Sequence, residues 1–311
     1  MRKWLLNIRH LAIAAGLLAG LTSSARAGYS EGGAFKTPGY GARAWGMGGA
    51  AVATVDDEGA VFWNPAMLGL LGSHKVGASY IDIVPGARAH QSQLAYAHVI
   101  RRSGENVEGV SVATHAAAVL FTNLRLGIQS GENYDENTIR LAYAYTPDFF
   151  ITFGFAMEVF ASTSDVGGFD SRGTSVDGAV RMMMTENFTL GIVARNAFSR
   201  ISYDDNADVR REREYAVGLS TRSVRHVTIE GDLIIAHNKA SRWILGFESE
   251  YLFDLLSLRG GYAINRTGEV RTIPYFGFGA RFRRITVHYN ADFDKDYAFS
   301  DTHRFTLSLS L

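Results

Sequence analysis

Few residues of this chain have the types and spacing that catalysis or metal binding requires. The run Gly173-Thr174-Ser175-Val176-Asp177 resembles the nucleophile elbow of hydrolases, but Asp177 stands where that motif needs glycine and no helical pattern follows it. The sequence contains no cysteine, which excludes disulfides, zinc thiolate sites and cysteine nucleophiles. It also lacks a His-Glu-x-x-His motif, and its histidines are scattered. We therefore predict a protein that is not an enzyme and has no catalytic residues, metal site or cofactor.

The acidic run Asp56-Asp57-Glu58 offers the oxygen ligands of a metal site. The same run is also typical of a helix start, where acidic side chains interact favourably with the helix dipole. We favour the helix start. The net charge of the chain is zero, with 31 basic and 31 acidic residues, which gives no reason to expect a nucleic-acid partner.

Apolar and polar residues alternate over most of the chain. From Arg284 to Phe293 every odd position is apolar and every even position is polar, and residues 303–311 and 226–236 repeat the pattern. A period of two is typical of β-strands with one apolar and one polar face. We predict fourteen strands, at 75–83, 90–100, 110–129, 137–146, 149–161, 173–184, 188–199, 212–221, 226–236, 241–251, 255–264, 270–282, 285–294 and 303–311.

Such strands build either a secreted sandwich, whose apolar face forms a core, or a membrane barrel, whose apolar face meets lipid. An even strand number favours the barrel. So do the connections, which alternate after the third strand between short turns and longer polar loops at 162–172, 200–211 and 295–302. Aromatic residues near both sets of strand ends are typical of the two lipid–water interfaces. We therefore predict an all-β fold: a transmembrane antiparallel β-barrel of about 14 strands over residues 74–311.

Charged residues on the polar faces would point into the lumen of this barrel. They could line a selective channel, or they could form mixed-sign ion pairs that fill a plugged lumen. Because both signs are well represented, we favour ion pairs. These lumen-facing residues are Arg140, Glu158, Asp177, Arg181, Arg195, Glu230, Asp232, Arg242, Glu248, Arg259, Arg271, Arg281, His288 and Asp292.

The N-terminus has the features of a secretory signal peptide over residues 1–27. Arg2 and Lys3 precede an apolar run from Leu11 to Leu21, and Ala25-Arg26-Ala27 supplies a cleavage site. A retained anchor helix is the alternative, but the run is shorter than the ~20 residues that a span needs. Export and a barrel together predict the cell outer membrane, with outer-membrane lipid, lipopolysaccharide and the barrel assembly machinery as partners.

Residues 28–73 lack the alternation and are rich in glycine, including Gly46, Gly48 and Gly49. Asn64-Pro65-Ala66 should form a rigid corner, because proline fixes one backbone angle and asparagine can hydrogen-bond its own turn. Phe62 and Trp63 would then wedge against the barrel wall or line an apolar pocket. We predict that this segment is a luminal plug, which either merely seals the barrel or carries its function.

Five runs of the chain resemble one family. They are Gly41-Ala42-Arg43-Ala44-Trp45-Gly46-Met47-Gly48-Gly49-Ala50, Ala51-Val52-Ala53-Thr54-Val55-Asp56-Asp57, Phe62-Trp63-Asn64-Pro65-Ala66-Met67-Leu68, Leu258-Arg259-Gly260-Gly261-Tyr262 and His303-Arg304-Phe305-Thr306-Leu307-Ser308-Leu309. This pattern resembles the PorV/PorQ outer-membrane proteins, which belong with the FadL-like (OMPP1/FadL/TodX) transport barrels. The resemblance implies a fourteen-stranded barrel with an N-terminal plug.

The resemblance leaves three functions open. The PorV/PorQ side implies a role in protein export or surface attachment of the type IX secretion kind, with secretion-system proteins as partners. The FadL side implies a channel for a small hydrophobic solute. A purely structural barrel is the third alternative.

Overall fold

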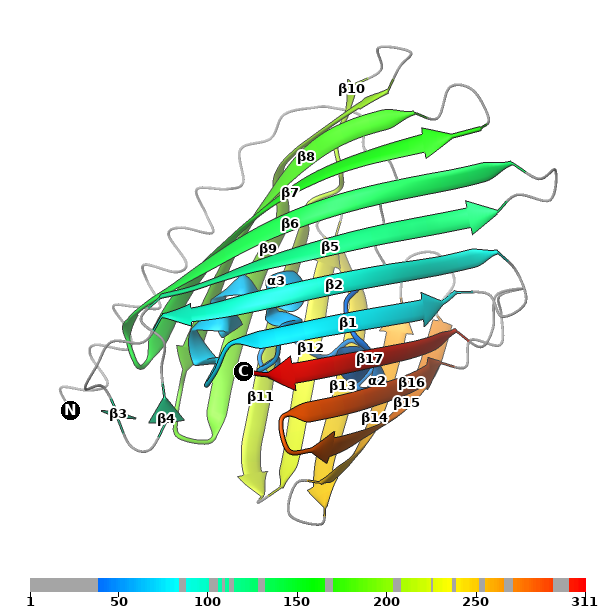
Figure 1. Cartoon of the computed structure of the whole chain (residues 1–311). Coiled ribbons are helices and arrows are strands. Elements are labelled where there is room, and N and C mark those ends of the chain that lie inside the picture. Colours follow the sequence, from blue (N-terminus) through cyan, green and yellow to red (C-terminus); the bar gives the residue numbers. More distant parts are fainter. Residues whose placement is uncertain are drawn as a thin grey trace.

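The computed structural model describes residues 39–83, 88–100, 106–107, 110–111, 115–127, 132–165, 170–203, 208–224, 226–236, 239–251, 255–265, 271–292 and 302–311. Fourteen long strands and the two-residue strand β10 form one antiparallel sheet. The sheet closes because β9 also pairs with β8, the last strand of its order (Figure 1). The predicted fourteen-stranded antiparallel barrel is thus confirmed. The predicted signal peptide, residues 1–27, lies outside the described residues.

Each long strand of the barrel pairs with its neighbours in chain order, and the last strand, β17, pairs with the first, β1. The long strands are β1 (Lys75–Asp82), β2 (Ala89–Ile100), β5 (His115–Gly127), β6 (Asn133–Asp148), β7 (Ile151–Ser164), β8 (Ser171–Met183), β9 (Phe188–Tyr203), β11 (Glu214–Val224), β12 (Val227–Ala236), β13 (Lys239–Tyr251), β14 (Leu256–Asn265), β15 (Arg271–Phe282), β16 (Ile285–Asp292) and β17 (His303–Ser310). β10 (Asp208–Val209) pairs with the end of β9.

One predicted strand, 110–129, is wrong at its start. β3 (Asn106–Val107) and β4 (Val110–Ser111) pair with each other in a separate two-stranded sheet, and the barrel strand β5 begins only at His115. Residues 110–112 alternate, but Ala113-Thr114-His115 interrupts the pattern, and the outward apolar residues of β5, such as Val119 and Phe121, are at odd positions.

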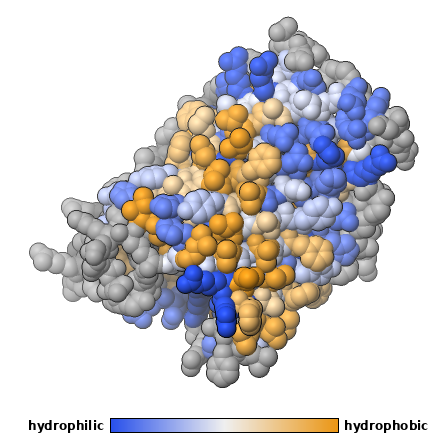
Figure 2. Space-filling view, in the orientation of Figure 1, coloured by the Kyte–Doolittle hydropathy of each residue, from blue (hydrophilic) through white to orange (hydrophobic). Residues whose placement is uncertain are grey.

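The faces of the strands distinguish the membrane barrel from the soluble sandwich. Leu94, Leu141 and Leu245 point outward and are 55%, 56% and 60% exposed, whereas Gln93, Glu158 and Glu230 point inward and are buried. A soluble sheet would place these sets the other way round. Figure 2 shows the apolar side chains as a band across one face of the barrel, with hydrophilic residues beyond it. No helix among the described residues is long and apolar enough to span a membrane.

Residues 39–73 lie inside the barrel and form α2 (Ala42–Gly46), α3 (Ala60–Trp63) and the 3-10 helix η1 (Pro65–Leu70). α2 packs against β14–β17, whereas η1 packs against β2 and β5–β8, so the segment touches opposite walls (Figure 1). Its apolar side chains pack on small inward residues of the wall, including Ala95, Ala118 and Ala142. We call residues 39–73 the plug. The part of the predicted plug before Gly39 lies outside the described residues.

Candidate functional site

The plug owes its path to a few residues with special backbone geometry. Gly48 and Gly49 follow α2 with φ of 75° and 87°, values that favour glycine. Asn64 has an extended backbone and caps η1, which begins at Pro65: its side chain accepts a hydrogen bond of 3.0 Å from the N–H of Ala66. The Asn64 amide also donates to the Val52 carbonyl at 2.6 Å. Asn64 therefore joins two turns of the plug at one corner.

Glycines on the inner face of the wall let the plug backbone approach closely. A Cβ on Gly261 would lie 2.2 Å from the Gly48 nitrogen and the Met47 carbonyl carbon. A Cβ on Gly246 would lie 2.6 Å from the Met47 carbonyl oxygen, and one on Gly154 would lie 2.1 Å from the Ala66 nitrogen. Contacts below 3.0 Å are far inside van der Waals distance, so any side chain here would displace the plug or the wall. Gly277 of β15 likewise lies against the plug, since a Cβ there would be 2.9 Å from the Gly46 Cα.

Two buried carboxylates of β12 bind the backbone of the plug. Asp232 accepts hydrogen bonds from the N–H groups of Ala51 and Val52 at 3.1 and 3.3 Å. Glu230 accepts from the Ala53 N–H and from the Thr54 hydroxyl. Successive backbone N–H groups form a concave site for acceptor oxygens, and here the wall itself supplies those oxygens. This contact fixes the plug without any cationic side chain.

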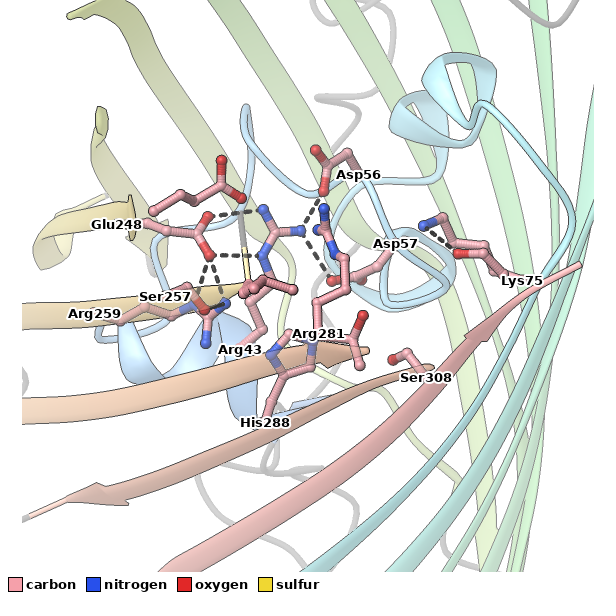
Figure 3. Close-up of a pocket in the computed structure, with 14 residues that line it drawn as sticks. Arg43, Asp56, Asp57, Lys75, Glu248, Ser257, Arg259, Arg281, His288 and Ser308 are labelled. Atoms are coloured by element: carbon pink, nitrogen blue, oxygen red, sulfur yellow. Dashed lines mark hydrogen bonds and ion pairs between the residues drawn. The ribbon is translucent and has the colours of Figure 1, made fainter. Parts of the chain in front are cut away.

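A charged network joins α2 to β13 and β14. Arg43 donates from Nη2 to Glu248 Oε2 at 2.8 Å and from Nη1 to Asp57 Oδ2 at 3.1 Å, and it also pairs with Asp56. Arg259 donates from Nε to Glu248 Oε1 at 2.7 Å. Figure 3 shows these groups around a polar pocket of about 50 Å³. Asp56 and Asp57 of the acidic run thus hold a plug arginine. The helix start expected at this run is also present, since α3 begins at Ala60 and the Gly59 N–H donates to Asp57 Oδ1 at 2.8 Å.

Glu58 lies apart from this network, in a buried position between the plug and β17. Its Oε1 accepts hydrogen bonds from the Tyr40 hydroxyl at 3.1 Å and the Ser308 hydroxyl at 2.6 Å. Burial raises the pKa of the Glu58 carboxyl to about 7, and the nearby Asp57 carboxylate adds to the shift. A carboxyl with this pKa changes its charge near neutral pH, at a point where plug and wall meet.

The plug carries an aromatic cluster inside the lumen, made of Trp45, Phe62 and Trp63. The Trp45 and Trp63 rings meet edge to face with centroids 5.7 Å apart, and the Phe62 centroid lies 5.2 Å from that of Trp63. Arginines of the wall cover these rings: Arg304 lies 4.5 Å from the Trp45 centroid, and Arg140 lies 5.6 Å from that of Phe62. The cluster combines aromatic faces with fixed cations, an arrangement that stabilises both by cation–π attraction.

The predicted polar-face residues occupy several environments. Arg140, Glu158, Asp177, Arg181, Glu230, Asp232, Glu248, Arg259 and His288 are buried. Arg195, Arg242 and Asp292 are half-buried, Arg281 is exposed beside the pocket of Figure 3, and the Arg271 side chain lies outside the description. Ion pairs of mixed sign form among them, as between Arg140 and Glu158 at 3.1 Å. Arg140 and Arg195 also donate to plug carbonyls, those of Val61 and Trp63.

Several residues of the site escaped prediction from the sequence. The sequence indicates Arg43 only as part of the family pattern, and it does not indicate that Gly246 and Gly261 contact the plug. Gln93 donates to the Gly39 carbonyl at 2.6 Å, and Thr306 accepts from the Ala42 N–H at 2.7 Å. The sequence signal for the wall residues among them is weak. Each is a polar or small residue at an inward strand position, and many other residues of that kind do not contact the plug.

Comparisons with known proteins agree with this architecture. No protein-family model matches the sequence, and no curated protein matches it. Among solved structures, the monoaromatic hydrocarbon channel CymD is similar with a TM-score of 0.63 and 14% identity, covering 89% of this chain and 99% of that one. The Pseudomonas putida toluene transporter TodX is similar with a TM-score of 0.60 and 13% identity, over 87% of this chain and 96% of that one. The Ralstonia pickettii toluene transporter TbuX is similar with a TM-score of 0.60 and 12% identity, covering 89% of this chain and 100% of that one. At these identities the likeness establishes a shared fold.

Proposed function

We propose that this chain is an outer-membrane transport barrel whose plug controls the passage of a small apolar solute, with monoaromatic compounds as the first candidates. The observation that carries this proposal is the cluster of Trp45, Phe62 and Trp63 in the lumen of a barrel that shares the fold of hydrocarbon channels. An aromatic solute can replace ring–ring contacts within such a cluster, because both make offset or edge-to-face contacts of similar strength.

The way the plug is held supports a gating role. Besides its apolar contacts with small wall residues, the plug is anchored by hydrogen bonds and ion pairs, such as those of Asp232 to Ala51 and of Arg43 to Glu248, and its backbone crosses glycine faces of the wall. Polar anchors of this kind can be broken one at a time and remade, because each contributes only about 0.5–1.5 kcal/mol net. A shift of the plug would open the lumen and leave the barrel intact, since the wall strands pair with one another around the full ring.

Solute uptake into proteoliposomes tests this proposal. We expect wild-type protein to raise toluene uptake above that of empty liposomes, while a sugar of similar mass gains much less. Phe62→Ala should lower toluene uptake several-fold because it removes one ring of the cluster. Phe276→Ala is the matched control, since Phe276 is 59% exposed on the outer face. Toluene uptake no faster than in empty liposomes would contradict the proposal.

A second candidate function rests on the family pattern of residues 41–68. The runs around Trp45-Gly46-Met47-Gly48-Gly49 and Phe62-Trp63-Asn64-Pro65 resemble PorV/PorQ proteins, and they support a role in protein export or surface attachment with a secretion-system partner. Deletion of the gene separates the two functions. Loss of proteins from the cell surface with normal hydrocarbon uptake would favour export, and the opposite result would favour transport.

A further inference from the structure

The regular strand pairing of the barrel wall is interrupted where β9 stops pairing with β11. The β9–β11 ladder ends at the pair Arg195–Glu214, and the register of β8 against β9 shifts between Val176 and Gly178. Asn196, at this point, has a φ of 53°. Beyond it, residues 211–213 run beside β9 without strand pairing. The wall there is an irregular stretch between two regular ladders.

Side chains take over the contacts of the missing ladder. The Arg211 N–H donates to the Ser199 hydroxyl at 2.9 Å, and the Asn196 amide donates to the Glu212 carbonyl at 2.8 Å. The Asn196 N–H donates to Asp177 at 2.8 Å, which ties the irregular stretch to the buried pairs of the lumen. These contacts hold residues 211–212 beside β9 without a backbone ladder, and a pocket of about 290 Å³ lies next to them.

This pocket is lined by four arginines and by apolar side chains. Arg200, Arg210, Arg211 and Arg213 line it together with residues that include Val176 and Phe198, and none of the lining residues is acidic. The Arg211 guanidinium pairs with Glu158 and lies 4.0 Å over the Phe160 ring, so it is fixed from the inner side. Two acids neighbour these arginines in the chain: Glu212 lies between Arg211 and Arg213, and Glu214 pairs with Arg195. The pocket is therefore a built, positively charged site beside an apolar surface; we call it the arginine pocket.

The arginine pocket lies at the level where the outer face of the barrel changes from apolar to polar. Val176 pairs with Phe198, which points outward and is 64% exposed. One step further along the same face, Thr174 pairs with Arg200, and the next pair is Arg172 with Ser202. Such a transition marks the lipid–water interface of a barrel. It lies toward the end of the barrel opposite the short turns at 184–187 and 283–284.

We propose that the arginine pocket binds a phosphate group of an outer-leaflet glycolipid, with an acyl chain of that lipid lying over Val176 and Phe198. Guanidinium groups bind phosphate through paired hydrogen bonds, and basic pockets at the membrane surface bind lipid head groups. A free phosphate offers the same anion without the apolar part. The lipid fits better because the arginines and the exposed Phe198 ring line one pocket. The inference rests on the proposed outer-membrane location, with the long loops outside, and is independent of solute transport.

Lipid binding to the purified full-length protein in detergent tests this site, with native mass spectrometry as the readout. The probes are bisphosphorylated lipid A, lipid A with both phosphates removed, and inorganic phosphate. We expect the wild-type protein to bind the phosphorylated form at least ten-fold more tightly than the dephosphorylated form. Arg200→Gln combined with Arg210→Gln should lower affinity for the phosphorylated form about ten-fold or more. Arg284→Gln, in the exposed turn at the other end, should change it less than about two-fold.

Equal binding of the two lipid A forms, or full affinity in the double variant, would overturn the proposal. If inorganic phosphate displaced lipid A at equal concentration, the pocket would be a free-anion site and the lipid assignment would be wrong. The single variant Arg213→Gln gives the same test should the double variant fail to fold, as judged by heat-modifiability on gels. This assay measures lipid binding and not toluene uptake. Failure of the lipid-binding proposal is therefore distinguishable from failure of the transport proposal.

Discussion

Arg43 of the plug and Glu248 of β13 are 205 residues apart in the sequence, yet the Arg43 Nη2 atom lies 2.8 Å from the Glu248 Oε2 atom. Arg259 binds the other oxygen of the same carboxylate. Glu248 is therefore shared between an arginine that belongs to the plug and one that belongs to the wall. A shift of the plug must separate the first pair while the second can persist.

Glu248→Gln should release the plug without unfolding the barrel. The substitution leaves Arg43 and Arg259 facing each other without the shared anion, and removal of one partner from a buried pair costs about 3–5 kcal/mol. We expect more frequent channel openings in planar bilayers. Glu186→Gln, in an exposed turn, is the control and should behave as wild type. Unchanged openings in Glu248→Gln would show that this network does not hold the plug.

Gly261→Ala should displace the plug by steric overlap. Its added methyl group would meet the backbone of Met47 and Gly48 at 2.2 Å, and overpacking of this kind costs about 1–3 kcal/mol. Gly178→Ala is the matched control, because a Cβ at Gly178 meets nothing within 4 Å. Limited proteolysis of the plug checks the prediction. Equal protection of the two variants would contradict the close approach of plug and wall.

The plug should be held less firmly at alkaline than at acidic pH. The Glu58 carboxyl has a pKa of 4.5 in its unperturbed state and about 7 when buried. Because docking raises this pKa, the protonated form stabilises the docked plug. That contribution is complete below the unperturbed value and is lost as the pH rises through about 7. We expect channel openings to increase between about pH 5 and about pH 8, and Glu58→Gln to reduce this dependence. An equally steep dependence in Glu58→Gln would assign it to another group.

Neighbouring residues of β16 should respond oppositely to polar substitution. Val287 is 45% exposed on the outer face, and His288 is buried inside. Val287→Arg places a cation in lipid, which costs roughly 2–4 kcal/mol near the middle of the membrane, and it should reduce the heat-modifiable folded form. His288→Gln keeps a polar side chain in a polar interior and should assemble normally. Greater damage from His288→Gln would contradict the register of this strand.

The barrel was predictable from the sequence because its pattern is local. Alternation with their immediate neighbours assigns Leu307 to the apolar face and Thr306 to the polar face, whichever strands lie beside them. The plug contacts are different in kind. Nothing near Asp232 in the sequence indicates that it binds the N–H groups of Ala51 and Val52, about 180 residues away. In the sequence, Gly261 looks like any other strand glycine; only the structure shows that the plug backbone at Met47 and Gly48 packs against it. The predicted strand 110–129 began too early because it ran across an interruption of the alternation at Ala113-Thr114-His115.

The central claim is that residues 39–73 close the lumen of a self-sufficient barrel. Single-channel conductance of a variant lacking residues 39–70 tests it most directly, with heat-modifiability on gels to show that the barrel has assembled. We predict a folded barrel with a large, continuously open conductance, where wild-type protein opens rarely. A folded variant whose conductance equals that of the wild type would contradict the account.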